Sequence, residues 1–94
     1  MQVILSAQAE KDLLSIWKFI ATDNPVAADH YLDALDAGIL KLAEFPELGI
    51  QRHDLLRELR CLTIERHLIF YLNSTSSIRI VRILHQAMDY RVKF

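Results

Sequence analysis

The segment Ile78–His85 constrains the fold of this chain more than any other run of residues. It contains four Ile or Val residues, and its apolar side chains fall on both faces of a strand. A strand that is apolar on both faces is typical of the interior of a sheet, covered on each side. The same segment carries Arg79, Arg82 and His85, and buried charges need partners. These three side chains therefore either join the sheet to its neighbours or line a functional site.

The first half of the chain predicts two helices. Apolar residues at helical spacing indicate a helix from Ala7 to Asp23, and Ser6 is a suitable N-cap residue. Asn24 followed by proline is typical of the start of a second helix, which ends at Phe45-Pro46. Because the break between these helices is short, we expect an antiparallel hairpin.

Four strand-like segments supply a sheet, and they are Gln2–Leu5, Leu59–Ile64, His67–Leu72 and Ile78–His85. Residues 46–57 are predicted to form a loop, and residues 73–77 form a polar hairpin turn. The order is therefore β-α-α-β-β-β. This order predicts an α+β fold in which an N-terminal strand and the two-helix hairpin pack on a mainly antiparallel sheet. A chain of 94 residues forms one domain, residues 1–94.

Charge is distributed unevenly along the chain. Residues 1–51 carry a net charge of −5 and residues 52–94 a net charge of +4, within an overall charge of −1. This division indicates either a basic docking face for an acidic partner or a solvated surface with an incidental bias. With a sequence pI near 6.4, strong direct binding to nucleic acid is not expected.

Composition argues against several other classes of protein. No apolar stretch is long enough to cross a bilayer, and the first residues lack the features of a secretory signal. The single cysteine, Cys61, forms no internal disulfide and is typical of a reducing compartment, so we expect a cytoplasmic protein. The only glycines, Gly38 and Gly49, form no phosphate-binding loop, and the four histidines lack metal-ligand spacing. We expect no metal and no cofactor.

A metal-free ribonuclease is the enzymatic function that the residues leave open. Such an enzyme needs a base, an acid and cations around the reacting phosphate, and Arg79, His85 and Tyr90 supply these types. In a regular strand, however, Arg79 and Arg82 point to opposite faces, and His85 shares a face only with Arg79. The alternative is structural, with both arginines paired to carboxylates and His85 capping a strand end.

Taken together, several motifs resemble the toxins of the RelE/ParE superfamily of bacterial type II toxin–antitoxin systems, and they are most similar to its ParE branch. The motifs are Leu5-Ser6, Ile16-Trp17, Asp23-Asn24-Pro25, Phe45-Pro46-Glu47-Leu48-Gly49, Arg60, Leu68-Ile69-Phe70-Tyr71 and Ile80–Gln86 with Met88-Asp89. Their order and spacing cover nearly the whole chain as a single ParE-like toxin domain.

This resemblance implies a toxin that acts by binding and not as an enzyme. ParE-like toxins are associated with inhibition of DNA gyrase, blocked replication, plasmid stabilisation and stress responses. A cognate antitoxin, encoded alongside, is expected to wrap the toxin through an acidic segment and form a hetero-oligomer with it. We expect Arg60, Phe70 and Arg82 at partner contacts or in support of them.

RelE-like relatives imply an alternative function, a ribosome-dependent mRNA endoribonuclease. In that case Arg79, His85 and Tyr90 would be the catalytic residues. The chain has no lysine between Lys41 and Lys93, so its sheet lacks the lysines of the RelE-type site. Many relatives carry a basic residue where this chain has Ala87, which leaves open a weakened toxin that serves mainly as an antitoxin partner.

Overall fold

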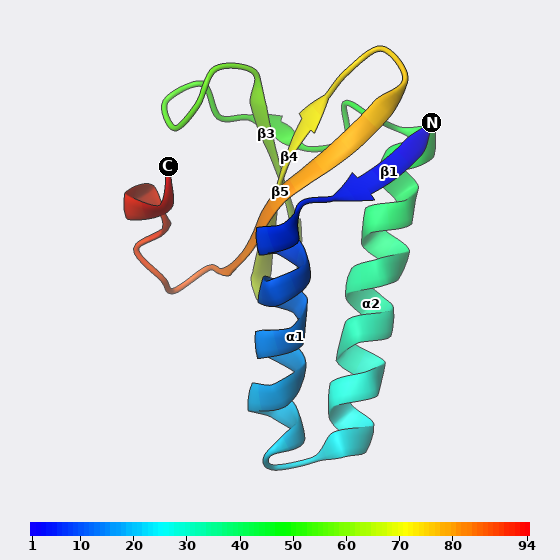
Figure 1. Ribbon diagram of the computed structural model, residues 1–94, viewed down its shortest axis with the longest axis vertical. Coiled ribbons are helices and arrows are strands. Elements are labelled where there is room, and N and C mark those ends of the chain that lie inside the picture. Colours follow the sequence, from blue (N-terminus) through cyan, green and yellow to red (C-terminus); the bar gives the residue numbers. More distant parts are fainter.

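A two-helix hairpin packs on one face of a five-stranded sheet in the computed structural model, which describes residues 1–94 (Figure 1). The elements are β1 (Gln2–Leu5), α1 (Ala7–Ala21), α2 (Pro25–Glu44), β2 (Ile50–Gln51), β3 (Leu59–Ile64), β4 (His67–Asn73), β5 (Ser77–His85) and the 3-10 helix η1 (Tyr90–Lys93). The predicted α+β fold class is confirmed.

Both helices begin at the residues that the sequence predicts. The Ser6 hydroxyl accepts a hydrogen bond from the N–H of Ala9 at 3.0 Å, and the Asn24 side chain accepts one from Ala27 at 3.1 Å. Each contact satisfies a backbone donor that the first helical turn leaves free. The first helix ends at Ala21, two residues before the predicted end. Figure 1 shows the connected ends of the helices projecting past the strands.

The strand order across the sheet is β1-β5-β4-β3-β2. The pair β1–β5 is parallel and the other three pairs are antiparallel, as expected for a mainly antiparallel sheet. The prediction that residues 46–57 form only a loop is wrong, because Ile50 and Gln51 pair with Cys61 and Arg60 as an edge strand. Two residues are too few to produce a recognisable alternating pattern.

A bulge in β5 changes which side chains share a face. Tyr71 pairs with Ile80 and Phe70 pairs with Arg82, so Val81 is an extra residue on β5. Residues that pair directly in an antiparallel sheet point to the same face. Arg79 and Arg82 therefore leave the same face of the sheet and His85 leaves the other. The predicted arrangement, which assumed a regular strand, is wrong.

Apolar side chains cover both faces of the sheet, as predicted for the run 78–85. The larger cluster lies between the sheet and the helices and includes Leu35, Ile69 and Ile80. The smaller cluster lies on the opposite face and consists of Leu59, Cys61, Phe70 and Leu84. Partly buried side chains of the segment before β3 and of the C-terminal tail pack against the smaller cluster, and they include Leu55, Tyr90 and Phe94.

The loop after α2 is held by one buried hydroxyl group. Tyr71 is fully buried, and its hydroxyl accepts from the N–H of Gly49 at 2.8 Å and donates to the carbonyl of Pro46 at 2.9 Å. Arg60 adds a bond to the Gly49 carbonyl at 2.6 Å. A side chain at position 49 would lie 2.7 Å from the Tyr71 ring and 2.9 Å from the backbone of Cys61, so only glycine fits there. These contacts position β2.

Replacing Tyr71 with Phe tests this arrangement. The substitution leaves the Gly49 N–H and the Pro46 carbonyl without their partner, so we expect a loss of about 1–3 kcal/mol of unfolding free energy in urea titrations. Tyr90→Phe is the matched control, because the Tyr90 hydroxyl is only half-buried and accepts one bond, from Arg52 at 3.3 Å. Equal losses in the two variants would contradict the proposed role of the Tyr71 hydroxyl.

Candidate functional site

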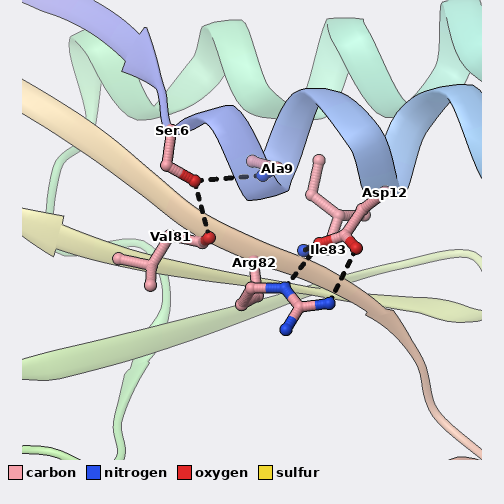
Figure 2. A network of polar contacts seen from close by, with 6 residues as sticks. All are labelled: Ser6, Ala9, Asp12, Val81, Arg82 and Ile83. Carbon is pink, nitrogen blue, oxygen red and sulfur yellow. Dashed lines mark hydrogen bonds and ion pairs between the residues drawn. The ribbon is translucent and has the colours of Figure 1, made fainter. Parts of the chain in front are cut away.

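A three-bond contact joins the first helix to the last strand (Figure 2). The Asp12 carboxylate of α1 accepts two hydrogen bonds from the Arg82 guanidinium, both at 2.8 Å, and a third from the backbone N–H of Ile83 at 2.9 Å. The two side chains are 12% and 18% exposed, respectively. Hydrogen bonding to Asp12 raises the pKa of Arg82, so this arginine stays charged.

Ser6 makes a second contact at the same edge of β5. Its hydroxyl donates to the carbonyl of Val81 at 2.8 Å, and its backbone N–H donates to the carbonyl of Ile80 at 2.9 Å. The strand β1 ends at Leu5, so beyond this point β5 has no neighbouring strand on that side. Ser6 and Asp12 thus take over the role of β1 along the edge of β5, as Figure 2 shows.

An open groove of about 800 Å³ lies between the hairpin and the adjoining ends of the strands. The helices contribute mainly apolar side chains to it, including Ile16, Phe19 and Ile20 of α1. The strands contribute the ends of β4 and β5, and the turn between β3 and β4 and the C-terminal tail form part of the rim. Phe19 is 83% exposed, which is unusual for an aromatic side chain without a partner.

Two histidines and a tyrosine meet where the groove reaches the sheet. The Tyr31 hydroxyl lies 2.6 Å from Nδ1 of His67, and the His67 and His85 rings are in edge contact with centroids 5.1 Å apart. Burial, together with the neighbouring His85, lowers the pKa of His67 below its usual value of 6.5. His67 is therefore neutral at pH 7.

The rim of the groove carries more basic than acidic groups. Arg66 and Lys93 make no ion pair within the chain, and Glu65 is the one acidic lining residue without a salt bridge. The other acidic lining residue, Asp12, is neutralised by Arg82. The groove is thus apolar along α1 and basic where it meets the strands and the tail, which favours a partner with an apolar stripe and carboxylates beside it.

Two residues predicted for partner contact or a supporting role make contacts inside the fold. Phe70 is fully buried, and its ring packs against Tyr90 and Phe94 with centroids 5.5 Å and 4.8 Å away. Arg60 donates to the carbonyls of Gly49 and Glu47. Direct partner contact by either residue stays a prediction. Arg82 also holds an internal contact, but it lines the groove.

The residues of the alternative ribonuclease site lie apart. Arg79 is exposed on the face of the sheet opposite the helices, because it pairs with Leu72, which packs against the smaller apolar cluster. Tyr90 packs on Phe70 on that same face, whereas His85 contacts His67 in the groove on the helical face. Of the three side chains, only His85 lines the groove. Burial also raises the pKa of the Cys61 thiol to about 11, so it is protonated at neutral pH.

Sequence reasoning missed Asp12, Tyr31 and His67. A signal for Asp12 was available, since it lies three residues after Ala9 and four before Ile16, on the apolar face of α1. A carboxylate on such a face needs a partner. Tyr31 and His67 carried no comparable signal, because they are 36 residues apart and meet only when the hairpin packs on the sheet.

No helix is long and apolar enough to span a membrane. No group of three or more His, Cys, Asp or Glu side chains is arranged to hold a metal ion.

Comparison with known proteins identifies the family. The sequence profile described as "ParE toxin of type II toxin-antitoxin system, parDE" matches residues 3–90. The chain therefore belongs to the ParE toxin family of type II toxin–antitoxin systems, and the predicted resemblance is confirmed. No match was found among curated protein sequences.

Solved structures share the fold. A chain of the chromosomal ParDE TA system from P. aeruginosa superposes with a TM-score of 0.78 and is 20% identical in sequence. The match covers 90% of this chain and 95% of the P. aeruginosa chain. At this identity the likeness establishes the fold alone.

Replacing Asp12 with Ala tests the contact between helix and strand. The change leaves Arg82 and the Ile83 N–H without their acceptor, so we expect a loss of about 2–4 kcal/mol of unfolding free energy in urea titrations. Asp12→Asn should lose less, because an amide oxygen still accepts from the backbone. Asp54→Ala is the control, since it removes an exposed carboxylate from Arg52 and should have little effect. A loss at Asp12 no greater than at Asp54 would refute the role assigned to this contact.

Proposed function

We propose that this protein is a toxin that inhibits DNA gyrase and so blocks replication, and that a cognate antitoxin silences it by binding. Membership of the ParE toxin family over residues 3–90 is the observation that carries this proposal. Gyrase acts on chromosomal and plasmid DNA, so the proposed place of action is the bacterial cytoplasm. In such a system the toxin contributes to plasmid stabilisation or to a stress response.

The proposed mode of action is binding without bond cleavage. The separation of Arg79, His85 and Tyr90 on two faces of the sheet supports this mode, because a ribonuclease needs its acid, base and cations around one phosphate. The buried, protonated thiol of Cys61 supports it further, since a nucleophilic cysteine is exposed and has a lowered pKa.

The groove is the proposed docking site for the antitoxin. An amphipathic helix places apolar residues along one stripe and charged residues beside it, and such a helix fits an apolar groove with a charged rim. Here Phe19, Ile16 and Ile20 would contact the apolar stripe, and Arg66 and Lys93 would face carboxylates of the antitoxin. The outer edge of β1 is free for strand addition by the same partner. The expected assembly is a hetero-oligomer of toxin and antitoxin.

Assays with purified gyrase test the proposed target. Incubating the protein with gyrase and plasmid DNA should reduce supercoiling and increase the yield of cleaved DNA, and premixing with the antitoxin should abolish both effects. After induction in cells, DNA breaks should accumulate while mRNA stays intact. Rapid mRNA decay with unchanged supercoiling would contradict the proposal and support the ribonuclease alternative.

Placing a negative charge in the groove tests the docking site. Phe19→Glu should weaken antitoxin binding about tenfold or more in calorimetric titrations, because it removes an apolar contact and repels acidic side chains. Leu40→Glu is the matched control, since Leu40 is 65% exposed on α2 and is not among the groove-lining residues. Both substitutions replace exposed side chains, so folding should be unaffected. Equal affinities for the two variants would show that the antitoxin binds elsewhere.

A further inference from the structure

Hydrogen bonds at Nδ1 constrain the protons of His67 and His85. The Tyr31 hydroxyl accepts from the backbone N–H of Arg66 at 3.2 Å, so its own proton is free to point at Nδ1 of His67. Nδ1 of His85 accepts from the backbone N–H of Ala87 at 3.0 Å. In a neutral His85 ring the proton is therefore on Nε2, and in a neutral His67 ring it is on Nε2 when the Tyr31 hydroxyl donates to Nδ1.

Both Nε2 atoms are unpaired within the protein. No hydrogen bond joins either atom to another residue, and no polar side-chain atom of the protein is both buried and unpartnered. Neither Nε2 atom is therefore fully buried, although His67 as a whole is only 8% exposed, and both histidines line the groove. A pair of imidazole donors in an open groove suits an acceptor, and a carboxylate is the strongest acceptor that a protein partner supplies.

The surrounding charges favour the same ligand. The titratable groups that line the groove around the histidines are Asp12 and Arg82, paired with each other, together with Tyr31, Glu65, Arg66 and Lys93. The positive charges of Arg66 and Lys93 attract an anion and disfavour protonation of the histidines. A bound carboxylate reverses this balance, because it stabilises the charged imidazolium.

We propose that this end of the groove is a subsite for one Asp or Glu side chain of the antitoxin, and that the histidine pair takes up a proton when that carboxylate binds. The inference rests on the proposed function, since it takes the antitoxin as the acidic occupant of the groove. Beyond the proposed function, it assigns an acidic residue of the antitoxin to the strand end of the groove. It also predicts that the affinity of the complex depends on pH.

The site can accept the proton without losing its internal contact. When Nδ1 of His67 becomes a donor, the Tyr31 oxygen still has a lone pair with which to accept from it. The Tyr31 proton is then free to turn toward the bound carboxylate. The proton comes from solvent, no covalent bond to carbon changes, and the direction of one hydrogen bond reverses.

The sign of the pH dependence follows from this linkage. Binding raises the pKa of the histidine pair above its value in the free toxin, so the added affinity is fully present below the pKa of the free pair. It is lost as the pH rises through the pKa of the complex. For one proton, the Kd increases by up to about tenfold per pH unit within this window.

Calorimetric titration of the full-length toxin with its antitoxin, the product of the gene encoded beside it, tests the subsite. Measurements between pH 6 and pH 8 in buffers of different ionisation enthalpy give the number of protons taken up on binding. For the unmodified toxin we expect a measurable proton uptake, of at most one proton for each complex formed. We also expect a Kd that decreases as the pH is lowered.

Histidine-to-asparagine variants assign the proton. In His67→Asn the side-chain oxygen replaces Nδ1 as an acceptor for Tyr31, and in His85→Asn it does so for the Ala87 N–H. Each variant should reduce proton uptake, and the double variant should abolish it. His53→Asn is the matched control, because Nδ1 of His53 accepts from the backbone N–H of Glu58 and His53 does not line the groove. A carboxylate-to-amide scan of the antitoxin should reveal one position with the same effect.

The outcomes separate the two proposals. Tight binding with no proton uptake and a Kd independent of pH would overturn the subsite and leave the proposed function intact. Uptake that survives in the double histidine variant would overturn the subsite in the same way. Absence of binding at every pH would overturn the proposed antitoxin partner, and the subsite with it.

Discussion

The contact of Asp12 and Ser6 with the edge of β5 determines the geometry of the rest of the molecule. β1 protects only the first half of that edge, and the chain then turns directly into α1. The exposed backbone groups of Val81 and Ile83 would otherwise lack partners, and the side chains of the N-cap Ser6 and of Asp12 in the first helix supply them. Since the same helix forms one wall of the groove and β5 ends in the other, this contact sets the relation between the two walls.

The extra residue on β5 determines which face of the sheet the later side chains of this strand point to. Because Val81 has no paired residue, Arg82 leaves the same face as Arg79 while His85 leaves the helical face. The Arg82 guanidinium is then held at the strand edge by Asp12, and His85 is free to contact His67 in the groove. A regular strand would have put Arg79 and His85 on one face. The bulge thus places Arg79 and His85 on opposite faces and gives the groove its second histidine.

Stability and recognition depend on different residues of the same elements. The family motif around Phe45–Gly49 is explained by the buried Tyr71 hydroxyl and by the space that only glycine fits, so it stabilises the loop before β2. Phe70 likewise belongs to the apolar cluster behind the sheet. The groove instead contains the exposed ring of Phe19 on α1 and the histidine pair, whose Nε2 atoms have no partner within the protein. A partner that covers the groove would bury apolar surface and supply acceptors to both imidazoles.

Local patterns in the sequence were sufficient for the elements, the caps at Ser6 and Asn24, the fold class and the family, because periodicity and capping depend on residues close together in the chain. They were insufficient for β2, for the bulge at Val81 and for the site. Strand register, and contacts such as Tyr31–His67 and Asp12–Arg82, join residues 36 and 70 positions apart. Only packing of the hairpin on the sheet brings such residues together, and one extra residue in a strand reverses the face of every side chain that follows it.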